Sequence, residues 1–229
     1  MSSAGPSGAG PSGPGSAGPA ADLGLRARKR AATQSALERA AISLALEHGY
    51  DHVTVDMICE AAVVSPRTFF NYFGTKDGAF LGGTPPQPTD AEHQAFVHGT
   101  GRDVLGDLVE MIAAAVADHS PDTELLRNRR MLIERTPELL TGETSRIAEL
   151  EEHLVQLVLD RFHAQGRTET GTPDLADEAR MVVALAGSVM RYSMQKWFSG
   201  GFTGSPGELL HHSLALVQRL TGTAVPAPR

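Results

Sequence analysis

The sequence has one cysteine and few aromatic residues, and it lacks any long apolar run. A lone cysteine, Cys59, forms no intramolecular disulfide and supplies no thiolate cage for a metal ion, so we expect it to be a small buried residue. No apolar run approaches the roughly 18 residues that a membrane-spanning helix needs, and the N-terminus has neither the charged nor the apolar region of a signal peptide. These absences predict a cytoplasmic protein without a membrane partner.

Arrangements of residues that would carry catalysis are missing as well. The nine histidines include no His-Glu-x-x-His motif. His93 and His98 are five residues apart and would lie on different faces of a helix, while His211 and His212 are adjacent. The segment GTGRDVLG contains Gly-x-Gly but follows no predicted strand and lacks the spacing of a dinucleotide-binding loop. We therefore expect no enzymatic activity, no catalytic residues, no metal site and no cofactor.

Basic residues are too few to balance the acidic ones, and the formal net charge is −7. The deficit is uneven, because residues 1–80 hold 7 Lys and Arg against 7 Asp and Glu, whereas residues 81–229 hold 13 against 20. A basic cluster, Arg26, Arg28, Lys29 and Arg30, comes just before the first periodic segment. Since local charge decides whether a DNA duplex is attracted, the N-terminal part remains a candidate for nucleic-acid binding, with a solvated arm as the alternative.

Residues 1–20 contain only Met, Gly, Ser, Pro and Ala. Such a composition has little to bury and a high entropy cost of ordering, so we expect a disordered tail over residues 1–24. The chain as a whole is 41% hydrophobic and 21% charged, which is typical of a globular protein. With 229 residues it is long enough for one large domain or two small ones.

Apolar residues beyond the tail recur with the period of a helix, as Leu105, Leu108 and Ile112 do at steps of three and four. Strand patterns are short, and no Asn-Gly or Asp-Gly turn separates two apolar runs. The segment GGTPPQPTD, residues 82–90, cannot continue a helix, so we expect a boundary between a unit over 25–82 and a larger one over 90–222. We predict an all-α fold with helices near residues 28–48, 54–62, 66–73, 76–82, 102–118, 121–135, 137–164, 173–199 and 206–221.

Five Ser-Pro or Thr-Pro pairs mark predicted helix starts. A hydroxyl at the N-cap accepts a hydrogen bond from an orphan backbone N–H, and a proline at the first helical position has no N–H to leave unpaired. The pairs begin at Ser65, Ser120, Thr136, Thr172 and Ser205. We expect the last pair to form a capping box, because Glu208 stands three residues after Ser205.

The segment SPRTFFNYFGTK, Ser65 to Lys76, has four aromatic residues within five positions. On a helix that begins at Pro66, three of them fall within about 100° and are expected to form a buried stripe, namely Phe69, Phe70 and Phe73. The opposite half carries hydrogen-bonding side chains: Arg67, Thr68, Asn71 and Tyr72. A short preceding helix, capped by Thr54, leads through a tight break at Val63 and Val64 into this one. The two helices predict a helix-turn-helix, whose second helix enters the major groove of DNA.

The run TVDMICEAAVVSPRTFFNYFGTKDGAF resembles the DNA-binding segment of TetR/AcrR-family transcriptional regulators. With the preceding RAATQSALERAAISLALEHGYDHVTV, the resemblance covers about residues 28–81. It implies an N-terminal three-helix helix-turn-helix domain and a C-terminal helical domain for ligand binding and dimerisation. It also implies a homodimeric repressor that binds a near-palindromic, double-stranded DNA operator, with half-sites roughly 34–36 Å apart. The resemblance further implies that a small apolar or aromatic effector releases the repressor from its operator.

The chain departs from the family pattern at three positions. Val63 stands where the family usually has glycine, so the turn either avoids a positive φ or strains a β-branched residue. Phe70 stands where tyrosine is common, and it has no hydroxyl for the phosphate contact of that position. Tyr72 replaces a common histidine and is expected to supply such a contact instead.

The chemistry of the resembling side chains assigns their roles. Arg67 is expected to read guanine through O6 and N7, and Asn71 to pair with adenine. Thr68 and Tyr72 are expected to contact base edges or phosphate. The DNA backbone would be held by Lys76, Thr54 and the basic arm, and the full predicted surface comprises Arg28, Lys29, Arg30, Thr54, Ser65, Arg67, Thr68, Asn71, Tyr72 and Lys76. The alternative is that Arg67 and Asn71 are only solvated and Tyr72 packs at the end of the helix.

The two last helices each carry an apolar face and are expected to pack with their symmetry mates as a four-helix interface. The predicted dimer residues are Val182, Ala186, Val189, Trp197, Leu210, Leu214 and Val217. The middle helices would enclose the effector, with Phe96, Met111, Met131 and Met190 as candidate lining residues and ordinary core packing as the alternative role. A competing hypothesis for the whole chain is a helical dimeric protein-interaction module with a degenerate helix-turn-helix.

Overall fold

The computed structural model describes residues 19–83, 89–117, 122–201 and 205–222. Over these ranges the chain forms helices and no strand, so the predicted all-α fold is confirmed. Residues 1–18 of the predicted tail lie outside the described residues, whereas residues 19–24 are helical, so the prediction of disorder is wrong for them. The helices are α1 (Pro19–His48), η1, a 3-10 helix (Tyr50–His52), α2 (Val55–Ala62), α3 (Pro66–Phe73), α4 (Lys76–Leu81), α5 (Asp90–Val97), α6 (Val104–Ala117), α7 (Thr123–Arg135), α8 (Pro137–Ala164), α9 (Leu175–Ser199) and α10 (Pro206–Thr221).

Three of the proline-marked helix starts are confirmed, at Pro66, Pro137 and Pro206, but of their preceding hydroxyls only that of Ser65 accepts the predicted cap hydrogen bond. The other two pairs fall short of the helices that follow them. Asp122 caps α7 by accepting a hydrogen bond from Leu125 N, whereas Asp174, at the N-cap position of α9, makes no side-chain cap bond. The described part of the chain begins again only at residue 122, so the Ser120 pair itself lies outside it.

The predicted capping box at Ser205 is wrong, since the Ser205 side chain makes no cap hydrogen bond. A capping box forms instead at the start of α5, a helix that the sequence patterns missed. Thr89 N donates to Glu92 Oε2 over 2.7 Å, and Glu92 N donates to Thr89 Oγ1 over 3.3 Å. These bonds to Thr89 hold the pKa of Glu92 below its usual range.

Helix α1 begins at Pro19, earlier than the predicted start near residue 28. The segment from Pro19 to Arg30 is rich in alanine, leucine and arginine, which favour helices, and proline is well tolerated at a first helical position. The basic cluster therefore belongs to a helix that continues into the N-terminal core.

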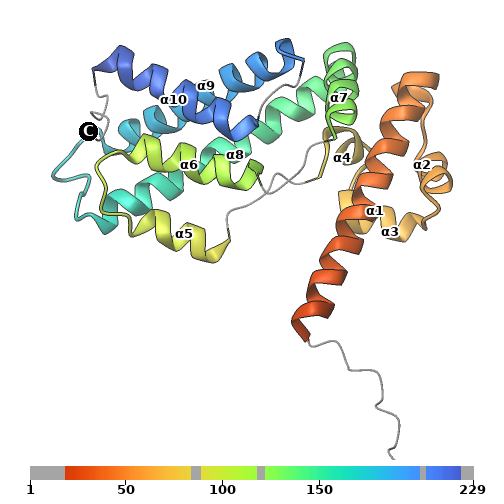
Figure 1. The fold of residues 1–229 in the computed structure, drawn as a ribbon, viewed down its shortest axis with the longest axis horizontal. Coiled ribbons are helices and arrows are strands. Elements are labelled where there is room, and N and C mark those ends of the chain that lie inside the picture. Colours follow the sequence, from red (N-terminus) through yellow and green to blue (C-terminus); the bar gives the residue numbers. More distant parts are fainter. Residues whose placement is uncertain (1–18, 84–88, 118–121, 202–204, 223–229) are drawn as a thin grey trace, which may run out of the picture.

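Two hydrophobic cores organise the molecule. Figure 1 shows α1–α4 at one end and α5, α6 and α8–α10 at the other, with α7 between them. The N-terminal core contains Phe69 and Phe80, both fully buried, and Cys59, which is buried as predicted and whose pKa is raised by that burial. The C-terminal core joins α5, α6, α8, α9 and α10.

The N-terminal core extends past the predicted boundary at residues 82–90. Leu125, Leu132 and Ile133 of α7, together with Leu139 of α8, pack into it. Helix α7 also contacts α1 and α4 directly. The helix-turn-helix is thus attached to the rest of the chain by apolar packing as well as by the connecting segment.

Candidate nucleic-acid interface

Hydroxyl caps fix the starts of both helices of the helix-turn-helix. Thr54 Oγ1 accepts a hydrogen bond from Met57 N over 3.2 Å at the start of α2. Ser65 Oγ accepts from Thr68 N over 3.1 Å at the start of α3, and lies 2.9 Å from Thr68 Oγ1. Thr54 and Ser65 are both exposed. A hydroxyl that accepts one backbone bond still carries a donor proton, so Thr54 keeps a group with which to bind phosphate.

The turn between these helices places Val63 in the left-handed region, with φ 55° and ψ 47°. Val63 N donates to Glu60 O over 3.2 Å and Val64 N donates to Cys59 O over 3.0 Å, which is the pairing of a Schellman motif. Glycine usually occupies this position because it has no Cβ to crowd the backbone. Val63 therefore retains the turn at the cost of backbone strain.

Helix α3 has a buried aromatic face and an exposed polar face. Phe69 is fully buried and Phe73 is half-buried, whereas Arg67 and Asn71 are exposed. The prediction that Phe70 belongs to the buried stripe is wrong, since Phe70 is 49% exposed. The physical reason is that Phe69 points into the core and Phe73 packs against it, while Phe70 lies at the edge of the stripe.

Tyr72 is half-buried rather than exposed. Its ring lies beside Phe73, with centroids 6.3 Å apart, and the guanidinium of Arg30 stands 4.9 Å from its centroid. A cation over a tyrosine face is attracted by the ring quadrupole. Tyr72 therefore links α3 to the basic cluster, in which Arg28, Lys29 and Arg30 are all exposed.

Lys76 has partners that the sequence did not predict. Its Nζ donates to the carbonyls of Tyr50 and Val53, each over 3.0 Å, and lies 4.1 Å from the centroid of the Tyr50 ring. Two of its three N–H donors are thus used inside the protein. Lys76 therefore positions the turn before α2, and its expected contact with phosphate, through the remaining N–H, stays a prediction. The Tyr50 hydroxyl in turn donates to Asp77 Oδ1 over 2.5 Å, and burial and this bond raise the pKa of Tyr50.

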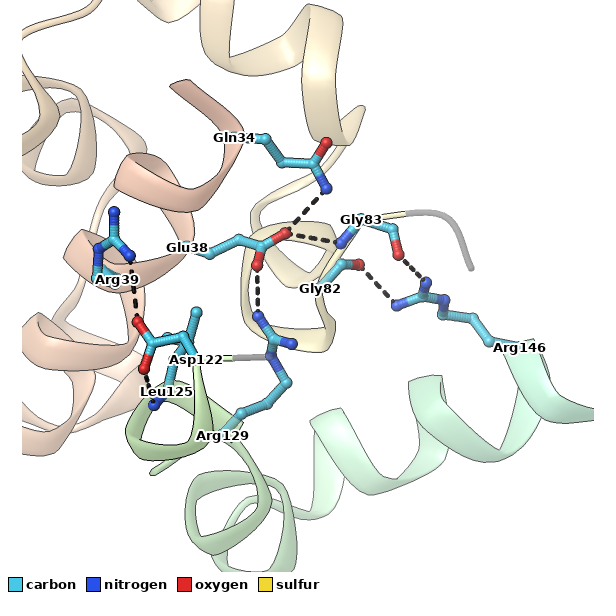
Figure 2. A network of polar contacts seen from close by, with 9 residues as sticks. All are labelled: Gln34, Glu38, Arg39, Gly82, Gly83, Asp122, Leu125, Arg129 and Arg146. Atoms are coloured by element: carbon cyan, nitrogen blue, oxygen red, sulfur yellow. Dashed lines mark hydrogen bonds and ion pairs between the residues drawn. The ribbon is translucent and has the colours of Figure 1, made fainter. Parts of the chain in front are cut away.

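A buried carboxylate connects the helix-turn-helix to α7, as Figure 2 shows. Glu38 of α1 is only 8% exposed. Its carboxylate accepts from Gln34 Nε2 and from Gly83 N, each over 3.0 Å, and pairs with Arg129 Nη2 at 2.7 Å. The bond between Arg129 and Glu38 is charge-assisted, and all three donors bind the same Glu38 carboxylate. Glu38 therefore ties α1, α7 and the end of α4 together.

The two glycines after α4 are also held from α8. Arg146 Nη1 donates to Gly82 O over 2.9 Å and Nη2 donates to Gly83 O over 2.7 Å, as drawn in Figure 2. Burial and then the neighbouring Arg129 charge lower the pKa of Arg146. Gly82 has φ 84° and ψ 160°, a backbone conformation that residues with a Cβ rarely adopt, so this position favours glycine. In the sequence only the paired glycines mark this contact between α1, α7 and α8, because the charged residues that form it, Glu38, Arg129 and Arg146, lie far apart.

Comparison with known proteins supports the features just described. Residues 38–81 match the family model described as bacterial regulatory proteins, tetR family. The chain is 32% identical over 188 residues to the HTH-type transcriptional regulator TcmR of Streptomyces glaucescens, covering 76% of this chain and 77% of TcmR. The chain belongs to the TetR family. It is therefore a DNA-binding transcriptional regulator with an N-terminal helix-turn-helix and a C-terminal helical domain.

The TetR-family fold is also found in a solved structure. NalD of Pseudomonas aeruginosa, described as the secondary repressor of the MexAB-OprM multidrug efflux pump, superposes with a TM-score of 0.51. It shares 18% identity and the match covers 87% of this chain and 100% of NalD. The likeness concerns the fold. Within the described residues, no group of three or more His, Cys, Asp or Glu side chains is placed to hold a metal ion, and no helix is long and apolar enough to cross a membrane.

The predicted effector residues of this TetR-family protein lie in or against its packed interior. Phe96 is buried in the C-terminal core, and Met111 and Met190 pack against that core, while Met131 is a half-buried residue of α7. A cavity of about 620 Å³ lies elsewhere, between α6, α8, α9 and α10. None of the four predicted residues lines it. Its apolar lining consists of Val104, Leu105, Phe162, Val182, Leu185 and Val217.

Most of the predicted dimer residues are unavailable to a second subunit. Five of the seven are buried inside the single chain: Ala186, Val189, Trp197, Leu210 and Leu214. Val182 and Val217 pack against the same core. The apolar faces read from the sequence are therefore the inward faces of α9 and α10. The outward face of α9 carries a different stripe, with Met181, Leu185 and Tyr192 exposed and Ser188 between them.

Proposed function

We propose that this TetR-family regulator is a dimeric repressor that binds a near-palindromic operator through α3 and is released by a small apolar or aromatic molecule. The observation that carries the proposal is the outward face of α3. Arg67 and Asn71 are exposed there, while Phe69 anchors the helix in the core and Ser65 fixes its first turn. A rigid helix with two exposed base-reading side chains is suited to the major groove.

Contacts with the DNA backbone would come from residues around this helix. Thr54 lies at the N-terminus of α2, where backbone N–H groups and the helix dipole favour an anion. Arg28 and Lys29 are exposed on α1 and would neutralise phosphates. Arg30 is also exposed, with its guanidinium 4.9 Å from the centroid of the Tyr72 ring. These contacts fix the register of α3 without reading sequence.

The two ends of the molecule are assigned different functions. We infer a DNA-binding domain over residues 25–82 and a regulatory domain over 90–222, with α7 packed against the former. The outward stripe of α9 is spaced at four, three and four residues, from Met181 through Leu185 and Ser188 to Tyr192, and so forms one continuous face. Leu220, 87% exposed at the end of α10, adds to the uncovered apolar surface. Two such faces related by a two-fold axis would pair α9 of one subunit with α9 of its partner.

The cavity between α6, α8, α9 and α10 is the proposed effector site. Its volume of about 620 Å³ falls in the range of sites for drug-sized molecules, about 300–1,000 Å³. The apolar half of the lining, Phe162 and five aliphatic residues, favours an apolar or aromatic ligand. The other half is polar and includes the ion pair of Arg167 and Glu178, and the Arg167 guanidinium stands 4.4 Å from the Phe162 ring centroid. Leu185 belongs both to this lining and to the outward stripe of α9. A ligand that prefers one packing of Leu185 would thereby shift the dimer between two states.

Substitution of Arg67 by alanine tests the assignment of the recognition helix. We expect a loss of about 1–3 kcal/mol in operator affinity, confined to one base-pair position whose preference is relaxed. Arg28→Ala, by contrast, should weaken binding to all sequences and reduce the salt slope by about one. Fluorescence anisotropy with operator variants over a salt series measures both effects, and Arg180→Ala on the exposed surface of α9 serves as the matched control.

Unchanged affinity and sequence preference in the Arg67→Ala protein would show that α3 is not the recognition helix. The protein-interaction hypothesis makes a different prediction for the salt series. An apolar protein contact loses little affinity with salt, whereas a DNA complex loses it in proportion to the phosphates neutralised. The two functions are therefore separated by the same titration.

A further inference from the structure

One aromatic side chain of α3 is not used to build the core. Phe69 is fully buried, and Tyr72 and Phe73 are half-buried against the N-terminal core. Phe70 leaves about half of its surface in solvent, at 49% exposed. A partly exposed aromatic ring on the helix that carries Arg67 and Asn71 calls for a specific role.

One side of the Phe70 ring is supported by the core. It meets the buried Phe69 ring edge to face, with centroids 5.4 Å apart and planes at 88°. This is a favoured aromatic geometry, and Phe69 is itself immobilised by the core. Phe70 therefore presents an exposed apolar surface that is backed by a buried ring.

Phe70 lies next to Arg67 on the helix surface. At 100° per residue the two side chains are about 60° apart around the axis, and three residues rise about 4.5 Å along it. One base-pair step of DNA is about 3.4 Å. A helix that brings Arg67 to one base pair thus brings Phe70 to that base pair or its neighbour.

Phenylalanine has no hydrogen-bonding group, so Phe70 reads base edges only through apolar contact. In the major groove the apolar group on a base edge is the C5-methyl of thymine. We infer that Phe70 contacts a thymine methyl group adjacent to the base pair read by Arg67 and so helps to determine operator sequence. This inference rests on the proposed DNA-binding function and adds a specificity residue to it.

Replacement of thymine by deoxyuridine removes only that methyl group and so isolates the contact. Operator sequences are first selected from random DNA by the wild-type protein, and each half-site thymine is then replaced in turn. Burial of one methyl group accounts for about a fourfold loss of affinity for a substitution in one half-site. Substitution in both half-sites of a symmetric operator gives about a fifteenfold loss. Deoxyuridine in the flanking DNA serves as the control for altered DNA flexibility and should have no effect.

Two variants assign the methyl contact to Phe70. In Phe70→Ala the ratio of thymine to deoxyuridine affinity should fall to about one at the sensitive position, because the apolar partner is gone. Phe70→Tyr keeps the ring and should keep the ratio. Circular dichroism tests whether both variants fold. If Phe70→Ala does not fold, the deoxyuridine replacements measured with the wild-type protein still decide whether a thymine methyl group is contacted.

Three results would overturn the inference. The wild-type protein could bind deoxyuridine and thymine operators equally at every position, or Phe70→Ala could retain the full discrimination, which would place another side chain on the methyl group. Failure of the folded wild-type protein to select any DNA would instead remove the proposed DNA-binding function as well. Phe70 would then belong to a surface for a protein partner.

Discussion

Replacing Val63 with glycine removes a backbone conformation that crowds a β-branched side chain. Val63 has φ 55° and ψ 47° and is 90% exposed, so its side chain contributes little packing to offset the strain. The left-handed conformation costs an L-residue about 1–2 kcal/mol. The greater freedom of glycine in the unfolded chain opposes the gain by about 0.4–1 kcal/mol. We therefore expect Val63→Gly to stabilise the protein by about 1 kcal/mol.

Urea unfolding at matched protein concentration measures this gain. The midpoint should rise without a change in the slope of unfolding free energy against urea, and the melting temperature should rise by about 2–4 °C for a chain of this size. Equal concentrations are needed because subunit association makes apparent stability depend on concentration. Operator affinity should stay the same, since the two backbone hydrogen bonds of the turn do not involve the valine side chain.

Val64→Gly is the matched control for this substitution. Val64 is the next residue, packs against the N-terminal core and does not have a positive φ. Glycine there removes apolar contacts and adds unfolded-state entropy, so it should destabilise the protein. If Val63→Gly were as destabilising as Val64→Gly, the left-handed turn at position 63 would be refuted.

Three other substitutions probe the contacts around the helix-turn-helix. Lys76→Met leaves two backbone carbonyls without their donor and should lower the unfolding free energy by about 1–3 kcal/mol, while the salt slope of DNA binding stays constant; denaturation and salt titration check the two parts. Arg129→Met strips the 8%-exposed Glu38 carboxylate of its ion-pair partner and should cost about 3–5 kcal/mol in urea unfolding, against less than about 1 kcal/mol for the exposed Arg180→Ala. The hydrogen bond from Leu125 N, in the first turn of α7, lowers the pKa of Asp122 in the folded protein below its unfolded value of 3.8. The ionised carboxylate therefore stabilises the fold fully above pH 3.8, and this contribution is lost as the pH falls through the lower, folded pKa. Asp122→Asn retains the cap and should flatten the stability curve in that range, as urea unfolding at a series of pH values would show.

Features of the helix-turn-helix were predictable from the sequence where they depend on near neighbours. The caps of Thr54 and Ser65 are set by the residues three positions on, and the structure places both as expected. The bounds of α3 follow from Pro66 and from the glycine that succeeds Phe73. Local hydrogen bonding decides these features, so the local sequence suffices to identify them.

Features that depend on distant segments were not predictable in the same way. An apolar stripe shows that a helix buries one face but does not identify what covers it, so Trp197 and Leu210 were assigned to a partner subunit although the chain's own core buries them. The bonds from Lys76 to the Tyr50 and Val53 carbonyls were not predicted, because those carbonyls lie 26 and 23 residues earlier in the sequence. The Glu38 and Arg129 pair joins residues 91 positions apart, and no local pattern records such a contact.

Selection of DNA fragments by the purified protein tests the central claim most directly. At near-physiological salt, a folded protein free of bound ligand should enrich a near-palindrome whose half-sites are centred about 34–36 Å apart, one turn of DNA. Its affinity for that sequence should fall steeply as salt is raised. Absence of any enriched sequence, from protein shown to be folded and dimeric, would contradict the account and favour a helical protein-interaction module.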